Sequence, residues 1–460
     1  MEYFTLLGAS TLVIAALAAA LYAQRRDLGL VVGIAALYYW SLYGAWWIVI
    51  DKTGGFSGQH YQYLESKMFP IALDGQYLLT LALYAGFIVG VELTLLAALA
   101  GGRERPVPRL VLRHDAILYA GFAAAAGSYL VIRDQLGMAW ATHASAYGYT
   151  RAEGGPWFTL HQVLNRLALI PPAIGMATLA AGERSRFFVN VSRRYTWPAY
   201  LLLAAAMGGF TFVLGNKNEV FTALLTGVLA YAGSVRRPPW WKAGLVVAAG
   251  LWFLAAVDFF RATPLSGIGA AVWARGQDAD DVSHFVTTSN EAFAAHFSLY
   301  GVLAAGTAPK FGYSLYSLAC SVIPRVLWPE RPRDIYLYYS ESVGAIQNQG
   351  YSLHHATGWY LNFGYAGVAL GAIALGLIWT LCLNARQRIR RRSGLLYRLF
   401  AIIAPWVLVA GLPPLIRAGP EGYKGLIVES FLIPLAVLLA ACRAPRSPPR
   451  GEAGRAWMAA

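Results

Sequence analysis

The stretch SVIPRVLWPERPRD, residues 321–334, places three arginines close together in a chain that is otherwise largely apolar. They are Arg325, Arg331 and Arg333. A guanidinium group binds phosphate oxygens through paired hydrogen bonds, and it keeps its charge when it is partly removed from water. Prolines at positions 324, 329 and 332 stop the stretch from continuing as a helix. These residue types indicate either an anion site or salt bridges to neighbouring acids and lipid headgroups.

A further cation lies in the short turn GNKNEV, between two apolar stretches. Lys217 in this turn can extend to lipid headgroups. It can also place its charge beside a lipid phosphate, where a helix beginning near Asn218 adds a favourable dipole. The two readings are equally compatible with the sequence.

The composition places these residues in a membrane protein. Of the 460 residues, 57% are hydrophobic and 13% are charged, whereas a soluble domain has about 25% charged residues. A helix that crosses a bilayer needs about 20 mostly apolar residues. We therefore predict an all-α, polytopic integral membrane protein in one domain, residues 1–460. Its eleven predicted spans are 3–23, 28–50, 71–100, 114–133, 161–182, 196–215, 218–235, 243–260, 361–385, 398–416 and 426–442.

The distribution of basic residues predicts the orientation. Alternate connections, together with the C-terminal tail, hold 23 of the 37 Lys and Arg residues but only 4 of the 23 Asp and Glu residues. This bias follows the positive-inside rule. It predicts a multi-pass protein with its N-terminus outside and its basic tail, 443–460, in the cytoplasm. The run RQRIRRR is then a topology signal, and no nucleic-acid partner is expected.

One long outer loop, residues 261–360, follows from this topology. Its segment 292–328 is too apolar for a solvated linker, but Pro309 and Lys310 divide it. We predict two short helices at the outer edge of the membrane, with a helical pair that crosses and returns as the alternative. The sequence contains no phosphate-binding loop and no zinc or disulfide pattern. We interpret Asp278, Asp280 and Asp281 as loop residues, and we expect no metal and no cofactor.

Four segments resemble the oligosaccharide repeat-unit polymerases, the Wzy-type O-antigen and exopolysaccharide polymerases. They lie within about residues 210–385 and read LGNKNEVFTALLTGVLAY, SNEAFAAHFSLYGVL, YSLYSLACSVIPRVLWPERP and GWYLNFGYAGVALG. The most specific features are Ile-Pro-Arg followed by Trp-Pro-basic-Pro, and a Tyr-x-Asn-Phe-Gly that opens an apolar helix. Two positions depart from the family pattern. Trp359 stands where the family often has an acidic residue, and Arg331 where it often has lysine.

This resemblance implies a GT-C-like membrane glycosyltransferase at the periplasmic face of a bacterial inner membrane. The implied substrates are oligosaccharide repeat units linked to undecaprenyl diphosphate. A hydroxyl group of one unit attacks the anomeric carbon of the other, and undecaprenyl diphosphate leaves. The diphosphate linkage supplies the energy, so no ATP site is needed. Membrane lipids, a chain-length regulator and a flippase are the implied partners.

The same resemblance implies roles for individual residues. Cations take up the charge that develops on the leaving diphosphate, and a base receives the proton of the attacking hydroxyl. The predicted catalytic residues are Arg325, Glu341 and His355. The predicted diphosphate-binding residues are Lys217, Arg331, Arg333, Arg417 and Lys424. The predicted sugar-contacting residues are Trp328, Tyr336, Trp359 and Asn362, of which the aromatic ones also suit the membrane interface.

Two alternative functions are compatible with the sequence. An O-antigen ligase-like transferase would use the same donor but deliver the glycan to a lipid A core. A polar-lipid flippase or transporter would hold charges near the bilayer midplane. Glu92 and Glu429 are the main charges deep within predicted spans, whereas most other charges lie at helix ends. This distribution favours chemistry at the membrane surface over transport.

Overall fold

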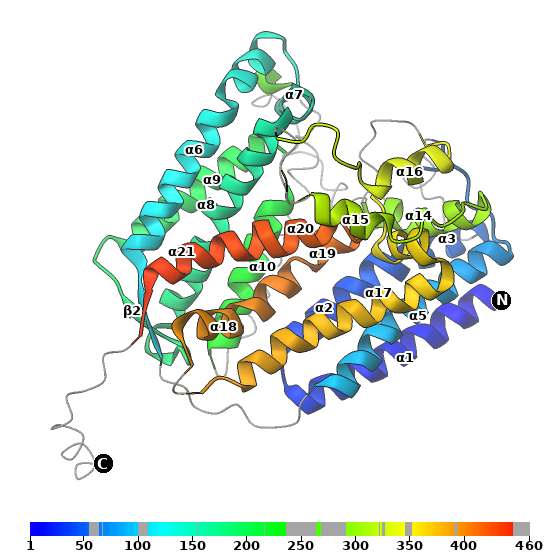
Figure 1. Cartoon of the computed structure of the whole chain (residues 1–460), viewed down its shortest axis with the longest axis horizontal. Coiled ribbons are helices and arrows are strands. Elements are labelled where there is room, and N and C mark those ends of the chain that lie inside the picture. The colour runs from blue at the N-terminus through cyan, green and yellow to red at the C-terminus, as the bar shows by residue number, and fades with distance from the viewer. Residues whose placement is uncertain are drawn as a thin grey trace.

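The computed structural model describes most of the chain as helices that run side by side (Figure 1). The described residues are 1–54, 64–66, 68–99, 109–153, 155–215, 217–235, 264–267, 291–321, 323, 327–345, 352–390 and 393–444. All structural statements below concern this part of the chain. Predicted span 243–260, Arg325 and the Asp278–Asp281 loop lie outside it.

Eight helical stretches in the described part are long and apolar enough to cross a membrane. They confirm a multi-pass, mainly helical membrane protein, whereas the predicted count of eleven is not confirmed. Five of them are single helices: α1 (Glu2–Arg25), α5 (Gly75–Ala98), α6 (His114–Ala141), α9 (Thr196–Val213) and α17 (His355–Gln387). The stretch Leu28–Lys52 consists of α2 (Leu28–Tyr38), η1 (Tyr39–Tyr43) and α3 (Gly44–Lys52), and Trp157–Arg184 covers most of α8 (Gly155–Ala181) and η2 (Gly182–Arg184). The stretch Gly422–Ala441 consists of α20 (Gly422–Lys424), η4 (Gly425–Leu432) and α21 (Ile433–Ala441).

Two further predicted spans correspond to shorter or less apolar elements. The stretch 218–235 forms α10 (Lys217–Ser234), and 398–416 divides into α18 (Leu395–Ala410) and α19 (Leu412–Ile416). Helices α6, α8, α9 and α10 contact one another, as do α1, α2, α5 and α17. Helix α18 contacts α10, α2 and α17 and so joins these two groups (Figure 1).

A small sheet lies at one end of the helices, which the all-α prediction did not include. Strand β1 (Leu110–Arg113) pairs in parallel with β2 (Phe188–Val191) and antiparallel with β3 (Cys442–Arg443). All three strands come from connections that the charge bias places on the same side of the membrane. The side chains of Asp27 and Arg386, from two more of these connections, lie 3.5 Å apart. The connections therefore meet at one end, as alternate connections must.

The described part of the long loop includes the short helices α14 (Glu291–Ala304), α15 (Tyr313–Cys320) and α16 (Ile335–Ser342). The 14 residues of α14 extend about 21 Å, too little to cross a hydrocarbon core of about 30 Å. Residues 292–303 are all buried, and the helix contacts α3, η1, α5 and α17. Helix α14 is therefore an internal helix that dips into the bundle.

Polar contacts fix α14 in this position. His296 Nδ1 donates to the Ser41 carbonyl oxygen at 2.7 Å, and His296 Nε2 accepts from the Tyr77 hydroxyl at 3.0 Å. The Ser41 hydroxyl lies 3.0 Å from His354 Nε2. Because buried polar groups cost free energy unless they are hydrogen-bonded, these contacts specify how α5, η1, α14 and α17 fit together.

Helix α17 is broken near its start. Phe363 has φ −141°, and Gly364 has φ 62° and ψ −146°, a conformation that glycine adopts far more readily than other residues. The break brings residues 355–362 against the rest of the helix. A Cβ atom on Gly367 would overlap the Trp359 carbonyl, and one on Gly371 would overlap the Trp359 indole. The absence of side chains at Gly367 and Gly371 therefore leaves room for Trp359 to pack against its own helix.

Candidate anion-binding site

Charged residues from three separate segments meet at the end of α10 opposite the sheet. Arg166 comes from α8, Lys217 and Glu219 from the first turn of α10, and Arg417, Lys424 and Glu429 from the stretch that runs from the end of α19 through α20 into η4. We call these six residues the anion-site cluster. A charge inside a membrane protein is costly and usually functional, so their convergence marks the strongest candidate site in the described part of the chain.

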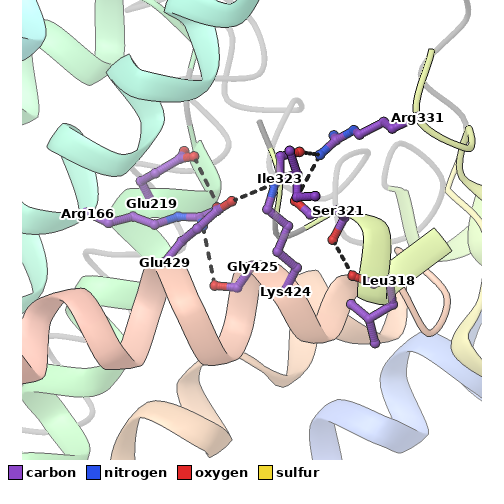
Figure 2. A network of polar contacts seen from close by, with 9 residues as sticks. All are labelled: Arg166, Glu219, Leu318, Ser321, Ile323, Arg331, Lys424, Gly425 and Glu429. Atoms are coloured by element: carbon purple, nitrogen blue, oxygen red, sulfur yellow. Dashed lines mark hydrogen bonds and ion pairs between the residues drawn. The ribbon is translucent and has the colours of Figure 1, made fainter. Parts of the chain in front are cut away.

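Arg166 is the centre of this cluster (Figure 2). Its Nη1 atom donates to Glu429 Oε2 and, at 3.4 Å, to the Gly425 carbonyl oxygen. Its Nη2 atom lies 4.0 Å from Glu219 Oε1. The side chains of Arg166, Glu219 and Glu429 are 16%, 4% and 12% exposed. Arg166 thus holds two buried carboxylates in place.

The position of Glu429 depends on an unusual backbone. Residues 425–432 form the π-helix η4, a rare conformation that is frequent at functional sites. The Lys424 ammonium group lies 3.8 Å from Glu429 Oε1. Glu429 therefore faces Arg166 and Lys424 at once, while Lys424 is 26% exposed and can approach a ligand.

The remaining cations complete a net positive site. Arg417 Nη1 donates to Asn218 Oδ1 at 3.3 Å, and its guanidinium carbon lies 6.0 Å from the centre of the Trp40 ring. Among the described residues in these contacts, three cations, Arg166, Arg417 and Lys424, lie with two carboxylates, Glu219 and Glu429. This excess of cations near a membrane surface suits a ligand with more than one negative charge, such as a diphosphate.

Glu421 links this cluster to the arginine-bearing stretch. Its Oε1 atom accepts a hydrogen bond from the Ile335 amide at 3.0 Å, where α16 begins. Its Oε2 atom is buried and has no hydrogen-bond partner in the described structure. Burial raises the pKa of Glu421 to about 7, and nearby Asp334 adds to the increase. This carboxyl group therefore changes its charge close to neutral pH.

The Glu421→Gln variant is expected to gain stability over wild type at pH 8 that it does not gain at pH 5. Because the pKa of Glu421 is raised, the folded state still holds a proton between about pH 4.5 and 7, whereas the unfolded state has released it. The stability that this proton provides is present below that window and is lost as the pH rises through it. The amide keeps an oxygen for Ile335 N and removes this dependence.

The measurement is the free energy of unfolding in detergent at both pH values. The rise in the pKa of Glu421 corresponds to about 3 kcal/mol. This is the upper limit for the pH-dependent difference in unfolding free energy between wild type and variant. Glu341→Gln, at an exposed position of α16, is the control. If the free energies of unfolding of wild type and Glu421→Gln differ by the same amount at pH 5 and pH 8, the raised pKa of Glu421 is contradicted.

The structure gives Arg331 an internal contact. Its Nη1 atom donates to the carbonyl oxygens of Ser321 and Ile323, both at 2.8 Å, and so closes the end of α15. Figure 2 shows the Lys424 side chain pointing toward this Ser321–Ile323 segment. Arg333 is exposed. A role for either arginine in binding diphosphate stays a prediction.

His355 is not placed to act as the predicted base. Its Nδ1 atom donates to the Gly419 carbonyl oxygen at 3.0 Å, and its Nε2 atom accepts from Trp359 Nε1 at 3.0 Å. A base needs a nitrogen lone pair for the incoming proton, and both ring nitrogens are in use here. His355 instead connects α17 to the turn that carries Glu421. Glu341 is exposed on α16 and stays the predicted base.

Two predicted sugar-contacting residues are also buried. Asn362 is fully buried: its side-chain oxygen accepts from Ser314 N at 2.9 Å, and its nitrogen donates to Ser314 Oγ and the Gly358 carbonyl. Trp359 is 7% exposed. In this arrangement both hold the broken start of α17 in place and do not face a sugar. Trp328 and Tyr336 are half-buried, and their sugar contacts stay predictions.

The sequence interpretation did not select Arg166, Glu219, Glu421 or Glu429 as site residues. Arg166 lies near the start of predicted span 161–182, and Glu429 lies inside predicted span 426–442. An ionisable residue within an apolar stretch is itself a signal of function. That signal was present for both, but the partner of each could not be read from the sequence.

The chain was also compared with known proteins. No protein-family model, curated protein or solved structure matched it.

Proposed function

We propose that this protein is a membrane glycosyltransferase that joins lipid-diphosphate-linked oligosaccharide repeat units into a longer glycan. The observation that carries the proposal is the anion-site cluster, in which Arg166, Arg417 and Lys424 meet Glu219 and Glu429, from three separate segments, among the described residues. Arg417 and Lys424 lie at helix ends, where a lipid headgroup can reach them, whereas Arg166 and Glu429 lie within helices. The resemblance of residues 210–385 to repeat-unit polymerases supports the choice of substrate.

The proposed reaction needs no group beyond the two substrates. The acceptor hydroxyl oxygen forms a bond to the anomeric carbon of the donor sugar. The bond between that carbon and the diphosphate oxygen breaks, and its electron pair leaves with the lipid diphosphate. The hydroxyl proton passes to a base, for which we retain Glu341. The products are the extended lipid-linked glycan and the free lipid diphosphate.

The cations have separate tasks in this scheme. Lys424 and Arg417, with Lys217, stabilise the negative charge that grows on the leaving diphosphate. Arg166 holds Glu219 and Glu429, which keeps the surrounding side chains in position before substrate arrives. We place the reaction at the periplasmic face of a bacterial inner membrane, with undecaprenyl diphosphate as the lipid carrier and the C-terminus in the cytoplasm.

Replacing Lys424 or Arg417 with alanine is expected to slow glycan extension on the order of 10²–10³-fold, the usual effect of removing one group that stabilises a developing charge. The test uses purified full-length protein in nanodiscs with an undecaprenyl-diphosphate-linked repeat unit. Products are resolved as a ladder of glycan lengths.

Two matched controls separate the cluster from general effects of charge. Lys310 has its ammonium group 3.8 Å from the centre of the Tyr338 ring, and Arg133 pairs with adjacent Asp134 in an exposed position. Alanine at either position should leave the ladder unchanged. Transfer only to added lipid A core would replace the polymerase with a ligase. Absence of transfer to either acceptor by folded wild-type protein would reject the proposal and favour lipid transport.

A further inference from the structure

The corner between β2 and α9 exposes arginine and aromatic side chains together. Arg193, Arg194, Tyr195 and Trp197 are all exposed, and so is Val191, the last residue of β2. Tyr119, in the second turn of α6, is 68% exposed. We call these six residues the β2–α9 corner. The 18 residues of α9 separate it from Lys217 by about 27 Å, so it is distinct from the anion-site cluster.

Local hydrogen bonds fix the shape of this corner. The Arg193 amide donates to Thr196 Oγ1 at 2.8 Å, which sets the backbone just before α9 begins. Arg193 Nη1 donates to the Tyr195 hydroxyl at 2.8 Å, and its guanidinium carbon lies 6.0 Å from the centre of that ring. One arginine is therefore held in a defined position although it is exposed to solvent.

Among the described residues around this corner, one acid lies near several arginines. Asp115 is the neighbouring acid, and its carboxylate pairs with Arg113 at 2.9 Å. Among the described residues of the corner, Arg193 and Arg194 therefore present two positive charges outward. A phosphodiester accepts hydrogen bonds from such a pair of guanidinium groups.

The aromatic residues indicate what carries the phosphate. Trp197 lies in the first turn of α9 and Tyr119 near the start of α6, and both helices are long enough to cross the membrane. Exposed Trp and Tyr side chains at the ends of such helices lie at the level of lipid headgroups. An occupant that satisfies both features has an anionic head beside an apolar tail. An acidic protein segment would leave the rings that face the acyl chains without a partner.

We propose that the β2–α9 corner binds an anionic phospholipid. Its phosphate lies between Arg193 and Arg194, and its acyl chains lie along Tyr119 and Trp197. This assignment does not depend on the proposed catalytic function.

Native mass spectrometry of the full-length protein, with phosphatidylglycerol and phosphatidylcholine added at equal concentrations, tests the proposal. Wild type should bind phosphatidylglycerol more tightly. Arg193→Gln and Arg194→Gln should each reduce that preference about five-fold, the usual effect of one basic residue near an anionic surface. Arg133→Gln, 14 residues along α6 from Tyr119, should leave the preference unchanged.

The dependence on salt concentration and the effect of removing Trp197 provide a second test. Raising the salt concentration from 0.1 to 1 M shortens the screening length from about 10 to about 3 Å, so the preference should fall in wild type and stay low in the double arginine variant. Trp197→Ala should weaken binding of both lipids equally. The proposal is wrong if wild type binds the two lipids equally, or if the double variant keeps the full preference while remaining folded.

Discussion

Replacing Arg166 with leucine is expected to lower the free energy of unfolding by about 3–5 kcal/mol and to abolish glycan transfer. The substitution leaves Glu219 and Glu429 buried without the cation that pairs with both. Glu219 must then be protonated or reach water, and Glu429 keeps only the more distant Lys424, so α10 or η4 is expected to move. Lys424 would lose its position with them, because Glu429 is its ion-pair partner. Chemical unfolding in detergent and the glycan ladder measure the two effects.

A combined variant separates the cost of leaving the two carboxylates unpaired from the loss of the arginine itself. Arg166→Leu together with Glu219→Gln and Glu429→Gln removes the whole buried ion cluster, which is often tolerated where removal of one partner is not. Stability should largely return in this variant, while transfer should stay low. Arg133→Leu, at an exposed position, is the control for arginine loss. Full stability and activity of Arg166→Leu alone would show that the cluster is not coupled as the distances indicate.

Gly367→Ala is expected to lower the free energy of unfolding by about 1–3 kcal/mol, the usual cost of inserting a methyl group into filled space. The new Cβ atom would overlap the backbone oxygen of Trp359, which cannot turn away as a flexible side chain could. The broken start of α17 would have to move. The Trp359 indole donates to His355, and His355 donates to the Gly419 carbonyl oxygen. A shift of Trp359 would therefore disturb the turn that carries Glu421, and transfer should fall as well.

Gly86→Ala is the matched control for this substitution. Gly86 is also a glycine within a long apolar helix, but nothing lies within 4 Å of a Cβ atom placed there. Alanine favours helix over glycine by about 1 kcal/mol, so this variant should be neutral or more stable. A Gly367→Ala protein with unchanged thermal unfolding would mean that α17 is not held in its broken form.

Apolar length predicted the helices well but not their internal breaks. The spans from 3–23 to 196–215 appear as helices because long apolar runs have few other stable conformations in lipid. The break at Phe363–Gly364 was not predicted, since a glycine in an apolar stretch is usually accommodated within a helix. The sheet was not predicted either, because its strands have four, four and two residues within arginine-rich connections.

The candidate site could be predicted only one residue at a time. Lys217, Arg417 and Lys424 were selected because they lie in short turns between apolar stretches. The structure places Arg417 beside Asn218, the neighbour of Lys217 in the sequence, and Lys424 beside Glu429. Which acid faces which cation is set by how α8, α10 and η4 pack, and no local pattern encodes that. His355 shows the reverse case. Its residue type suits a base, but its neighbours Trp359 and Gly419 use both ring nitrogens.

The order in which the site residues occur along the chain has a consequence for biosynthesis. Arg166 and Glu219 leave the ribosome well before Lys424 and Glu429, which belong to the last helical stretch of the described chain. Strand β3 follows at Cys442–Arg443 and joins a sheet whose first strand was made more than three hundred residues earlier. An unfinished chain therefore has neither the second carboxylate for Arg166 nor the strand that fastens the last helix. We expect transfer activity to begin only after residues 422–443 have been made, so that products truncated before them stay inactive in the membrane.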